Sequence, residues 1–183
     1  YFVFLSIETI GNNAFQHCSK LVSVHFADNS HLKTIGTNAF SECTYLTSIA
    51  FPASLTTIES YAFYDCVRLT QATIDTYSQL ENIDSYAFSY CKSLKQIYLP
   101  AQVKVERIAF DKCWSLNSIK LDAANTQHIM SQNALYTADG QTLLAYAYDC
   151  DLDSLIMTPE VKTIPDFSFK PEKLKKLYIV GKQ

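Results

Sequence analysis

The apolar residues of this chain recur in a fixed pattern. Five segments share the order Ala-Phe, two residues, Cys, two residues, Leu, two residues and a small or aliphatic residue, as in "AFSECTYLTSI" from Ala39 to Ile49. Successive phenylalanines of the pattern are 25, 23, 25 and 22 residues apart. A repeat of this length is typical of a solenoid, in which each coil buries its apolar side only by stacking on the next. The sequence therefore predicts one elongated domain over residues 1–183.

Within each repeat, two kinds of local structure are expected. The last apolar positions alternate, as Ile49 and Phe51 do, which predicts a short strand; Pro52 and Pro100 then end two of these strands. The Phe, Cys and Leu positions are spaced by three, which predicts a short helical or 3-10 turn. The expected fold is a solenoid with a parallel strand ladder on one face and helical or 3-10 turns and loops on the other.

Identical residues of successive coils should stack in columns inside the solenoid. The expected core column consists of Phe15, Phe40, Phe63, Phe88, Phe110, Phe169, Cys18, Cys43, Cys66, Cys91 and Cys113. Coils about 4.8 Å apart do not exclude disulfides by distance, but parallel side chains and an odd number of thiols favour buried free cysteines. Zinc sites use Cys or His pairs separated by two to four residues, and the column has no such pair.

The period is lost over about residues 122–160, after regular repeats over about residues 1–121. Two apolar runs there flank Ala138–Gly140, which predicts a hairpin-like insertion. The pattern returns in a last repeat over about residues 161–180. The opening residues Tyr1–Phe4 align with the strand end of a preceding repeat and lack the features of a signal peptide, which indicates a fragment of a longer chain.

These motifs resemble the BspA-like leucine-rich repeats. The stretch "LKTIGTNAFSECTYLTSIAFP", from Leu32 to Pro52, follows the repeat pattern of that family almost completely. The segment "ALYTADGQTLLAYA" is similar to an interruption that such proteins often carry. The resemblance implies a leucine-rich-repeat solenoid and a location at the cell surface or outside the cell, in anaerobic bacteria or parasitic protists. It also implies adhesion to, or recognition of, molecules of a host or of neighbouring cells.

The chain's charge argues against nucleic-acid binding. The formal net charge is −3, and the 15 basic residues are dispersed along the sequence until a Lys-rich end. A nucleic-acid surface should instead show a basic stripe, so neither nucleic acid nor another polyanion is an expected partner. No apolar run approaches the roughly 18 to 20 residues that a membrane span needs, so none is expected in this chain.

Catalytic and metal-binding chemistry is not expected either. Buried thiols have raised pKa values and little access, so pairing of a repeat Cys with His25, His31 or His128 is disfavoured. Cys150 lies outside the repeat in the acidic run "DCDLD", which lacks the Gly and Glu of an EF-hand loop and is interpreted as a solvated loop. With only 4 glycines and no phosphate-binding loop, the sequence indicates neither a cofactor nor an enzyme.

Outward-facing residues of the strands form the predicted binding surface, because they alternate with the buried ones. The candidate residues are Ser23, His25, Ser48, Gln71, Thr73, Gln96, Tyr98, Ser118, Lys120, Lys176 and Tyr178. Among them Tyr98, Lys120 and Tyr178 are the favoured contacts, since Tyr is enriched at binding hot spots. The first hypothesis is a recognition module for a protein or glycan; the second is a structural spacer or coat repeat without a ligand.

Overall fold

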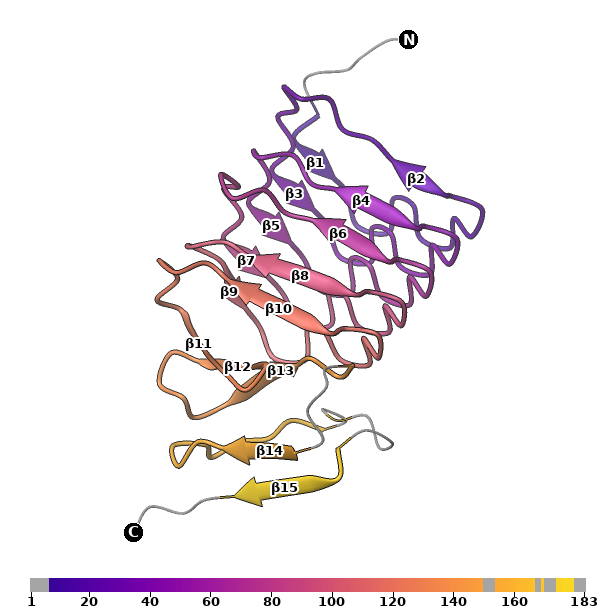
Figure 1. Ribbon diagram of the computed structural model, residues 1–183. Helices are drawn as coiled ribbons and strands as arrows, with labels where there is room; N and C mark the ends of the chain where they lie inside the picture. The colour runs from indigo at the N-terminus through magenta and orange to yellow at the C-terminus, as the bar shows by residue number, and fades with distance from the viewer. Residues whose placement is uncertain (1–6, 150–153, 167–168, 170–173, 180–183) are drawn as a thin grey trace.

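The computed structural model describes residues 7–149, 154–166, 169 and 174–179. The chain winds through five regular coils, each contributing two short strands to two parallel ladders that lie one behind the other (Figure 1). An antiparallel sheet and a last pair of parallel strands follow towards the C-terminus. The parallel solenoid that the repeat predicts is thus confirmed.

The front ladder contains the strands that follow the Cys and Leu positions. Its strands are β2 (Ser23–Val24), β4 (Ser48–Ala50), β6 (Gln71–Thr73), β8 (Gln96–Leu99) and β10 (Ser118–Leu121). Equivalent residues pair in register, so Ile49 lies beside Val24 and Ala72, and Tyr98 lies beside Lys120. Strands β2, β4 and β6 form one hydrogen-bonded sheet and β8 and β10 another, with β6 next to β8 (Figure 1).

The back ladder is a second row of strands that the sequence did not predict. It contains β1 (Thr9–Ile10), β3 (Thr34–Ile35), β5 (Thr57–Ile58), β7 (Asn82–Ile83) and β9 (Lys104–Val105). These strands are two residues long, too short for an alternation of apolar and polar positions to reveal them. Their aliphatic residues point inward, and Ile35, Ile58 and Ile83 are fully buried.

The segment between the two ladders is not helical, so the predicted helical or 3-10 turns are wrong. No helix occurs in the part of the chain that the structure describes. In the second coil the chain instead makes successive β-turns, with Ala39 N–H donating to Gly36 O and Cys43 N–H to Phe40 O, each at 3.1 Å. The third residues of these turns, Asn38 and Glu42, have φ values of 55° and 60°, which is characteristic of type II turns.

Stacking of the coils explains why turns replace a helix. The N–H groups of Phe40 and Glu42 donate to the carbonyls of Ala62 and Tyr64 in the next coil, at 2.8 and 2.7 Å. A helix would use those N–H groups within its own segment. Each coil has one residue with positive φ two positions after the Phe and another just before the Ala-Phe pair. These residues orient peptide N–H groups towards the next coil.

Five phenylalanine rings form a continuous stack along the interior. Successive rings from Phe15 through Phe40, Phe63 and Phe88 to Phe110 have centroids 5.1, 5.3, 5.2 and 5.5 Å apart and are nearly parallel. The last four are at most 1% exposed, whereas Phe15 is 42% exposed because it belongs to the first coil that the structure describes. The stack supplies much of the solenoid core.

The repeat cysteines form a second internal row. The thiols of Cys43, Cys66, Cys91 and Cys113 are buried, and each donates to the carbonyl of the Phe one coil earlier at 3.1 to 3.2 Å. Cys18 is exposed instead, again because it lies in the first described coil. All five cysteines are free, as expected. Cys150 lies outside the described residues.

The insertion is a three-stranded antiparallel sheet. It contains β11 (His128–Ser131), β12 (Ala134–Thr137) and β13 (Leu143–Tyr146), and the predicted hairpin around Ala138–Gly140 joins β12 to β13. The sequence analysis missed β11, which a two-residue turn connects to β12. Both turn residues, Gln132 and Asn133, have positive φ, as a type I′ turn requires.

Side chains of the insertion bind the end of the back ladder. Val105 N–H donates to Nε2 of the buried His128 at 3.2 Å. The Asn125 amide donates to the carbonyls of Pro100 and Val103 at 2.8 and 3.2 Å. These side chains form hydrogen bonds with backbone N–H and C=O groups that would otherwise be free to bind a further coil. The edge of the back ladder is therefore protected from pairing with another strand.

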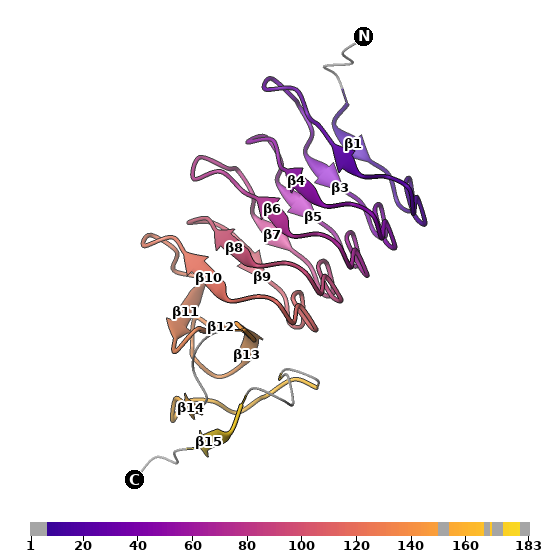
Figure 2. The ribbon, with the colours of Figure 1, turned by 45° about the vertical axis from the view of Figure 1, so that its right-hand side comes forward.

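The last strands do not extend the front ladder directly. β14 (Ser154–Met157) pairs in parallel with β15 (Lys176–Ile179), and the antiparallel sheet lies between β10 and this pair (Figures 1 and 2). Phe169 packs against Tyr146, with ring centroids 5.6 Å apart, rather than on Phe110. The expectation that Phe169 continues the core column is therefore wrong, because the insertion displaces the last repeat.

Candidate binding surface

The outward side of the front ladder, here called the front face, presents one row of side chains per coil. The candidates on β2 to β10 are exposed or half-exposed, while the residues between them are turned inward. The parallel register places Ser48 beside Ser23 and Gln71, and Gln96 beside Ser118. The front face therefore brings together nine of the eleven candidate residues.

A hollow of about 220 Å³ opens in the N-terminal half of the front face. Its lining includes His25, Ser48, Gln71 and Thr73, which are all candidates, together with Ala50. Ala50 occupies the repeat position that Tyr98 and Lys120 fill in later coils. Its small side chain leaves this space open, with hydroxyl, amide and imidazole groups around it.

The hydroxyl of Tyr98 is fixed by a neighbour. It donates a hydrogen bond to Asp122 Oδ2 at 2.5 Å, and this bond to the carboxylate raises the pKa of Tyr98 to about 12. Tyr98 is half-buried, and its register partner on β10 is the exposed Lys120. The two residues are thus neighbours on adjacent strands, with the phenol of Tyr98 protonated at neutral pH.

Lys176 and Tyr178 do not join this surface as predicted. They pair with Ser154 and Ile156 of β14, not with residues of β10. The antiparallel sheet separates them from Lys120 (Figure 1). Lys176 and Tyr178 were predicted from their positions in the repeat, and those positions do not reveal that the insertion interrupts the ladder.

The repeat thiols and His128 are built into the core. Burial raises the pKa of the Cys43 thiol to about 11, and burial raises the pKa values of Cys66, Cys91 and Cys113 further. Burial also lowers the pKa of His128, whose Nε2 accepts a backbone hydrogen bond. The buried thiols are therefore protonated and poorly nucleophilic at neutral pH.

Among the described residues no group of three or more His, Cys, Asp or Glu side chains could hold a metal ion. Of the acidic run, Asp149 is exposed, and residues 150–153 lie outside the described part. A helix long and apolar enough to cross a bilayer is likewise absent from the described residues.

Sequence reasoning missed a row of cations and aromatic rings beside the front face. This corner row lies one or two positions after the repeat Cys and consists of Lys20, Tyr45, Arg68, Lys92 and Trp114. The Arg68 guanidinium lies 3.9 Å from the centre of the Tyr45 ring, and Lys92 Nζ lies 5.5 Å from that of Trp114. Sorting the basic residues by repeat position, rather than along the chain, would have revealed the row.

Comparison with protein families gives a match over most of the chain. The family model described as a BspA type leucine-rich repeat region matches residues 6–138 in six copies. No curated protein sequence matches the chain.

Solved structures share the fold. A leucine-rich repeat protein of T. pallidum is 33% identical, with a TM-score of 0.59, over 64% of this chain and 54% of that chain. A leucine-rich repeat protein of Bacteroides ovatus is 26% identical, with a TM-score of 0.65, over 93% of this chain and 40% of that one. A leucine rich cell surface protein of Faecalibacterium prausnitzii is 23% identical, with a TM-score of 0.67, over 93% and 54%. This chain thus spans about half or less of these proteins.

Proposed function

Because the chain belongs to the BspA-type leucine-rich repeat family, we propose that it is a non-enzymatic recognition module that binds a protein or glycan through the front face. The observation that carries the proposal is the contrast between the two sides of the front ladder. Inward positions repeat the same residue types from coil to coil. The outward ones change, as from Ala50 to Thr73 and Tyr98. A rigid ladder with varied exposed side chains is suited to specific recognition.

The arrangement of chemical groups supports binding rather than catalysis. The buried thiols are protonated, and His128 is engaged with Val105 and Asn125. On the front face, hydroxyl, amide and ammonium groups surround an open hollow instead of converging on one reacting atom. Such a surface provides hydrogen bonds and van der Waals contact over a wide area.

We further propose a location at the cell surface or outside the cell, where a partner on host or neighbouring cells can be reached. The similar Faecalibacterium prausnitzii protein carries a cell-surface description in its own name. Family membership gives this proposal its main support.

The test is a binding screen of the chain against extracellular matrix proteins and glycans. Replacing Gln71, Tyr98 and Lys120 by Ala should weaken binding at least tenfold, since a few hot-spot residues carry most interface energy. A control with Lys33, Glu81 and Lys104 replaced by Ala removes exposed residues on or next to the back ladder. Equal binding by both variants, at unchanged melting temperature, would overturn the front face as the binding surface. Absence of binding to every probe would favour a spacer without a ligand.

A further inference from the structure

Acidic residues are excluded from one part of every regular coil. The eight residues that follow each repeat Cys include the front strand and are 19–26, 44–51, 67–74, 92–99 and 114–121. They hold five Lys or Arg residues and no Asp or Glu, although the whole chain has 18 acidic residues against 15 basic ones. A chain of net charge −3 thus has one region with charge of the opposite sign.

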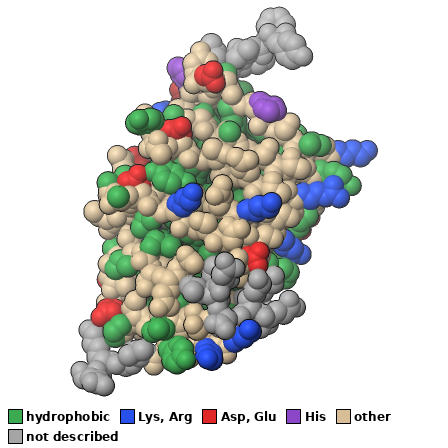
Figure 3. All heavy atoms as spheres, viewed as in Figure 1, with side chains coloured by type: hydrophobic (Ala, Val, Ile, Leu, Met, Phe, Trp, Pro, Cys, Tyr) green, Lys and Arg blue, Asp and Glu red, His purple; other side chains and the backbone are tan. Residues whose placement is uncertain are grey.

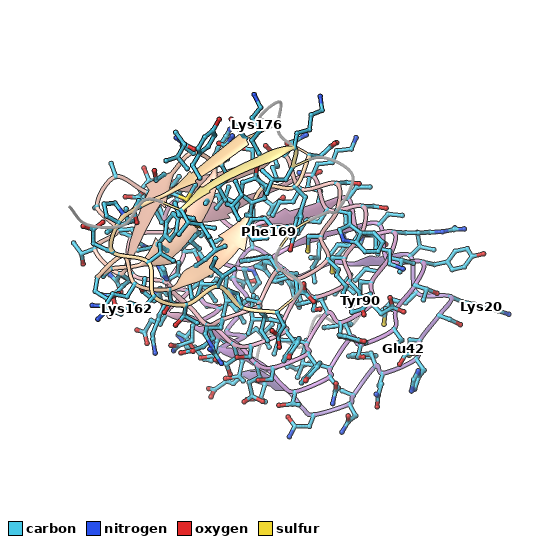
Figure 4. The ribbon with its side chains drawn as sticks, turned by 90° about the horizontal axis from the view of Figure 1, so that it is seen from below. Lys20, Glu42, Tyr90, Lys162, Phe169 and Lys176 are labelled. Atoms are coloured by element: carbon cyan, nitrogen blue, oxygen red, sulfur yellow. The ribbon has the colours of Figure 1, made fainter. Side chains whose placement is uncertain are left out.

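Folding gathers these segments into one continuous surface. The parallel register stacks them coil upon coil. Lys20, Arg68 and Lys92 lie in the corner row, Lys95 directly precedes β8, and Lys120 lies on the front face. Figure 3 shows Lys and Arg side chains along the right-hand side of this face, where the front strands begin. Figure 4 shows Lys20 at this turn side of the coils, across the molecule from Lys162.

Among the residues that the structure describes, the five cations have no carboxylate partner at ion-pair distance. The ion pairs found among the described residues involve His17, Lys104 and Lys112 instead. Arg68 and Lys92 lie against aromatic rings, and rings leave a cation's charge uncompensated. Two acidic groups border the surface. Burial raises the pKa of Asp65 and the charge of Lys92 opposes this rise, while Asp122 accepts a hydrogen bond from Tyr98.

From this we propose, resting on the proposed function, that the front face and its corner row bind an acidic polysaccharide with carboxylate or sulfate groups. Unpaired cations complement its charge, and the Tyr45 and Trp114 rings offer flat apolar contact to sugar rings. Ser23, Ser48 and Gln71 supply neutral hydrogen-bonding groups for sugar hydroxyls. Polyanions were not expected as partners because the basic residues are dispersed along the sequence. The stacking of the coils brings five of these residues together on one side of the solenoid.

The geometry favours a polysaccharide over an acidic peptide. An extended peptide binds most readily by adding a strand to a free sheet edge, where backbone groups are unpaired. The front face is the broad side of the ladder and not an edge: β4 pairs with β2 and β6, β8 pairs with β10, and β6 lies next to β8. A ligand lying across this side must therefore be recognised by side chains, which suits a polymer rich in hydroxyl and acidic groups.

The experiment measures binding to polygalacturonate and to a sulfated polysaccharide, with dextran as the neutral probe and polyglutamate and single-stranded DNA as other polyanions. Replacing Lys20, Arg68 and Lys95 by Gln should weaken binding to the acidic polysaccharides about tenfold, since each exposed ion pair contributes roughly two- to fivefold. Binding should also fall as salt rises, because about 1 M salt screens charges beyond roughly 3 Å.

The matched control replaces Lys33, Lys104 and Lys162 by Gln, which changes the net charge equally away from the front face. Retained binding by the control supports the proposal, and equal loss in both variants overturns it. Tighter binding of polyglutamate or DNA than of the polysaccharides also overturns it. Binding of dextran alone, or of a matrix protein alone in the screen described above, overturns the proposal of an acidic polysaccharide but leaves the proposed function standing. Absence of binding to every probe in both experiments overturns the proposal of an acidic polysaccharide and the proposed function.

Discussion

Replacing Phe63 by Ala removes the middle ring of the stack, and its effect can be compared with that of Phe15→Ala at the same repeat position. Phe63 is fully buried, with stacked neighbours at 5.3 and 5.2 Å and Phe51 edge-on at 5.6 Å. Its loss combines the transfer term with a closed cavity, for which core Phe→Ala changes cost about 3–5 kcal/mol. Phe15 is 42% exposed and stacks on Phe40 alone among the described rings, so solvent can fill its place.

For Phe15→Ala the expected loss of unfolding free energy is about 0.8–1.5 kcal/mol, because roughly half of the 1.5–3 kcal/mol for a buried Phe applies. At about 2–4 °C per kcal/mol for a chain of this size, Phe63→Ala should lower the melting temperature by roughly 6–20 °C and Phe15→Ala by roughly 2–6 °C. Circular dichroism and the fluorescence of Trp114, the only Trp, provide two probes of unfolding. Equal losses in the two variants would refute the reasoning that burial between two neighbouring coils sets the contribution of each ring.

Three further changes test other parts of the structure. Ile108→Asn should stabilise the fold by about 1 kcal/mol in thermal unfolding, because a β-branched residue is held at φ 58° at this position. The reverse change at the equivalent position, Asn38→Ile, should lower the free energy of unfolding, and a change of the same sign in both variants would contradict this reasoning. A thiol reagent should modify the exposed Cys18 in the folded protein and the buried Cys91 only after unfolding, so comparable native rates would contradict the thiol row. Burial raises the pKa of Asp111 to about 6, so this carboxyl favours folding most below its ordinary pKa of 3.8, and that contribution is lost as pH rises through about 6. Asp111→Asn should therefore raise the melting temperature relative to the parent at pH 7.5 and much less at pH 4.5, and a difference independent of pH would contradict it.

Repeat arithmetic was sufficient to predict the stack, because Phe40, Phe63, Phe88 and Phe110 keep the same distance to the following Cys. It could not predict the turn conformation, since spacing by three fits both a helix and a run of β-turns. Hydrogen bonds to the next coil decide between them, as Phe40 N–H to Ala62 O illustrates, and these join residues more than twenty positions apart.

The candidate surface was predictable where the register is regular and unpredictable beyond the insertion. Alternation alone placed Gln71 and Tyr98 outward, whereas Lys176 was assigned to the same row although the antiparallel sheet lies between. The clustering of basic residues was also not predicted. Arg68 and Lys95 are far apart in sequence, and only the stacking of the coils brings their segments together.

The edge of the solenoid where the chain leaves each front strand tolerates added residues. From Phe26 to Leu32 and from Ile74 to Leu80 the connection out of the front strand is two residues longer than from Phe51 to Leu55, yet the ladders on either side keep their register. An engineer wishing to graft a reporter, an epitope or a second domain would choose this margin, since new sequence leaves there without disturbing the stacked interior.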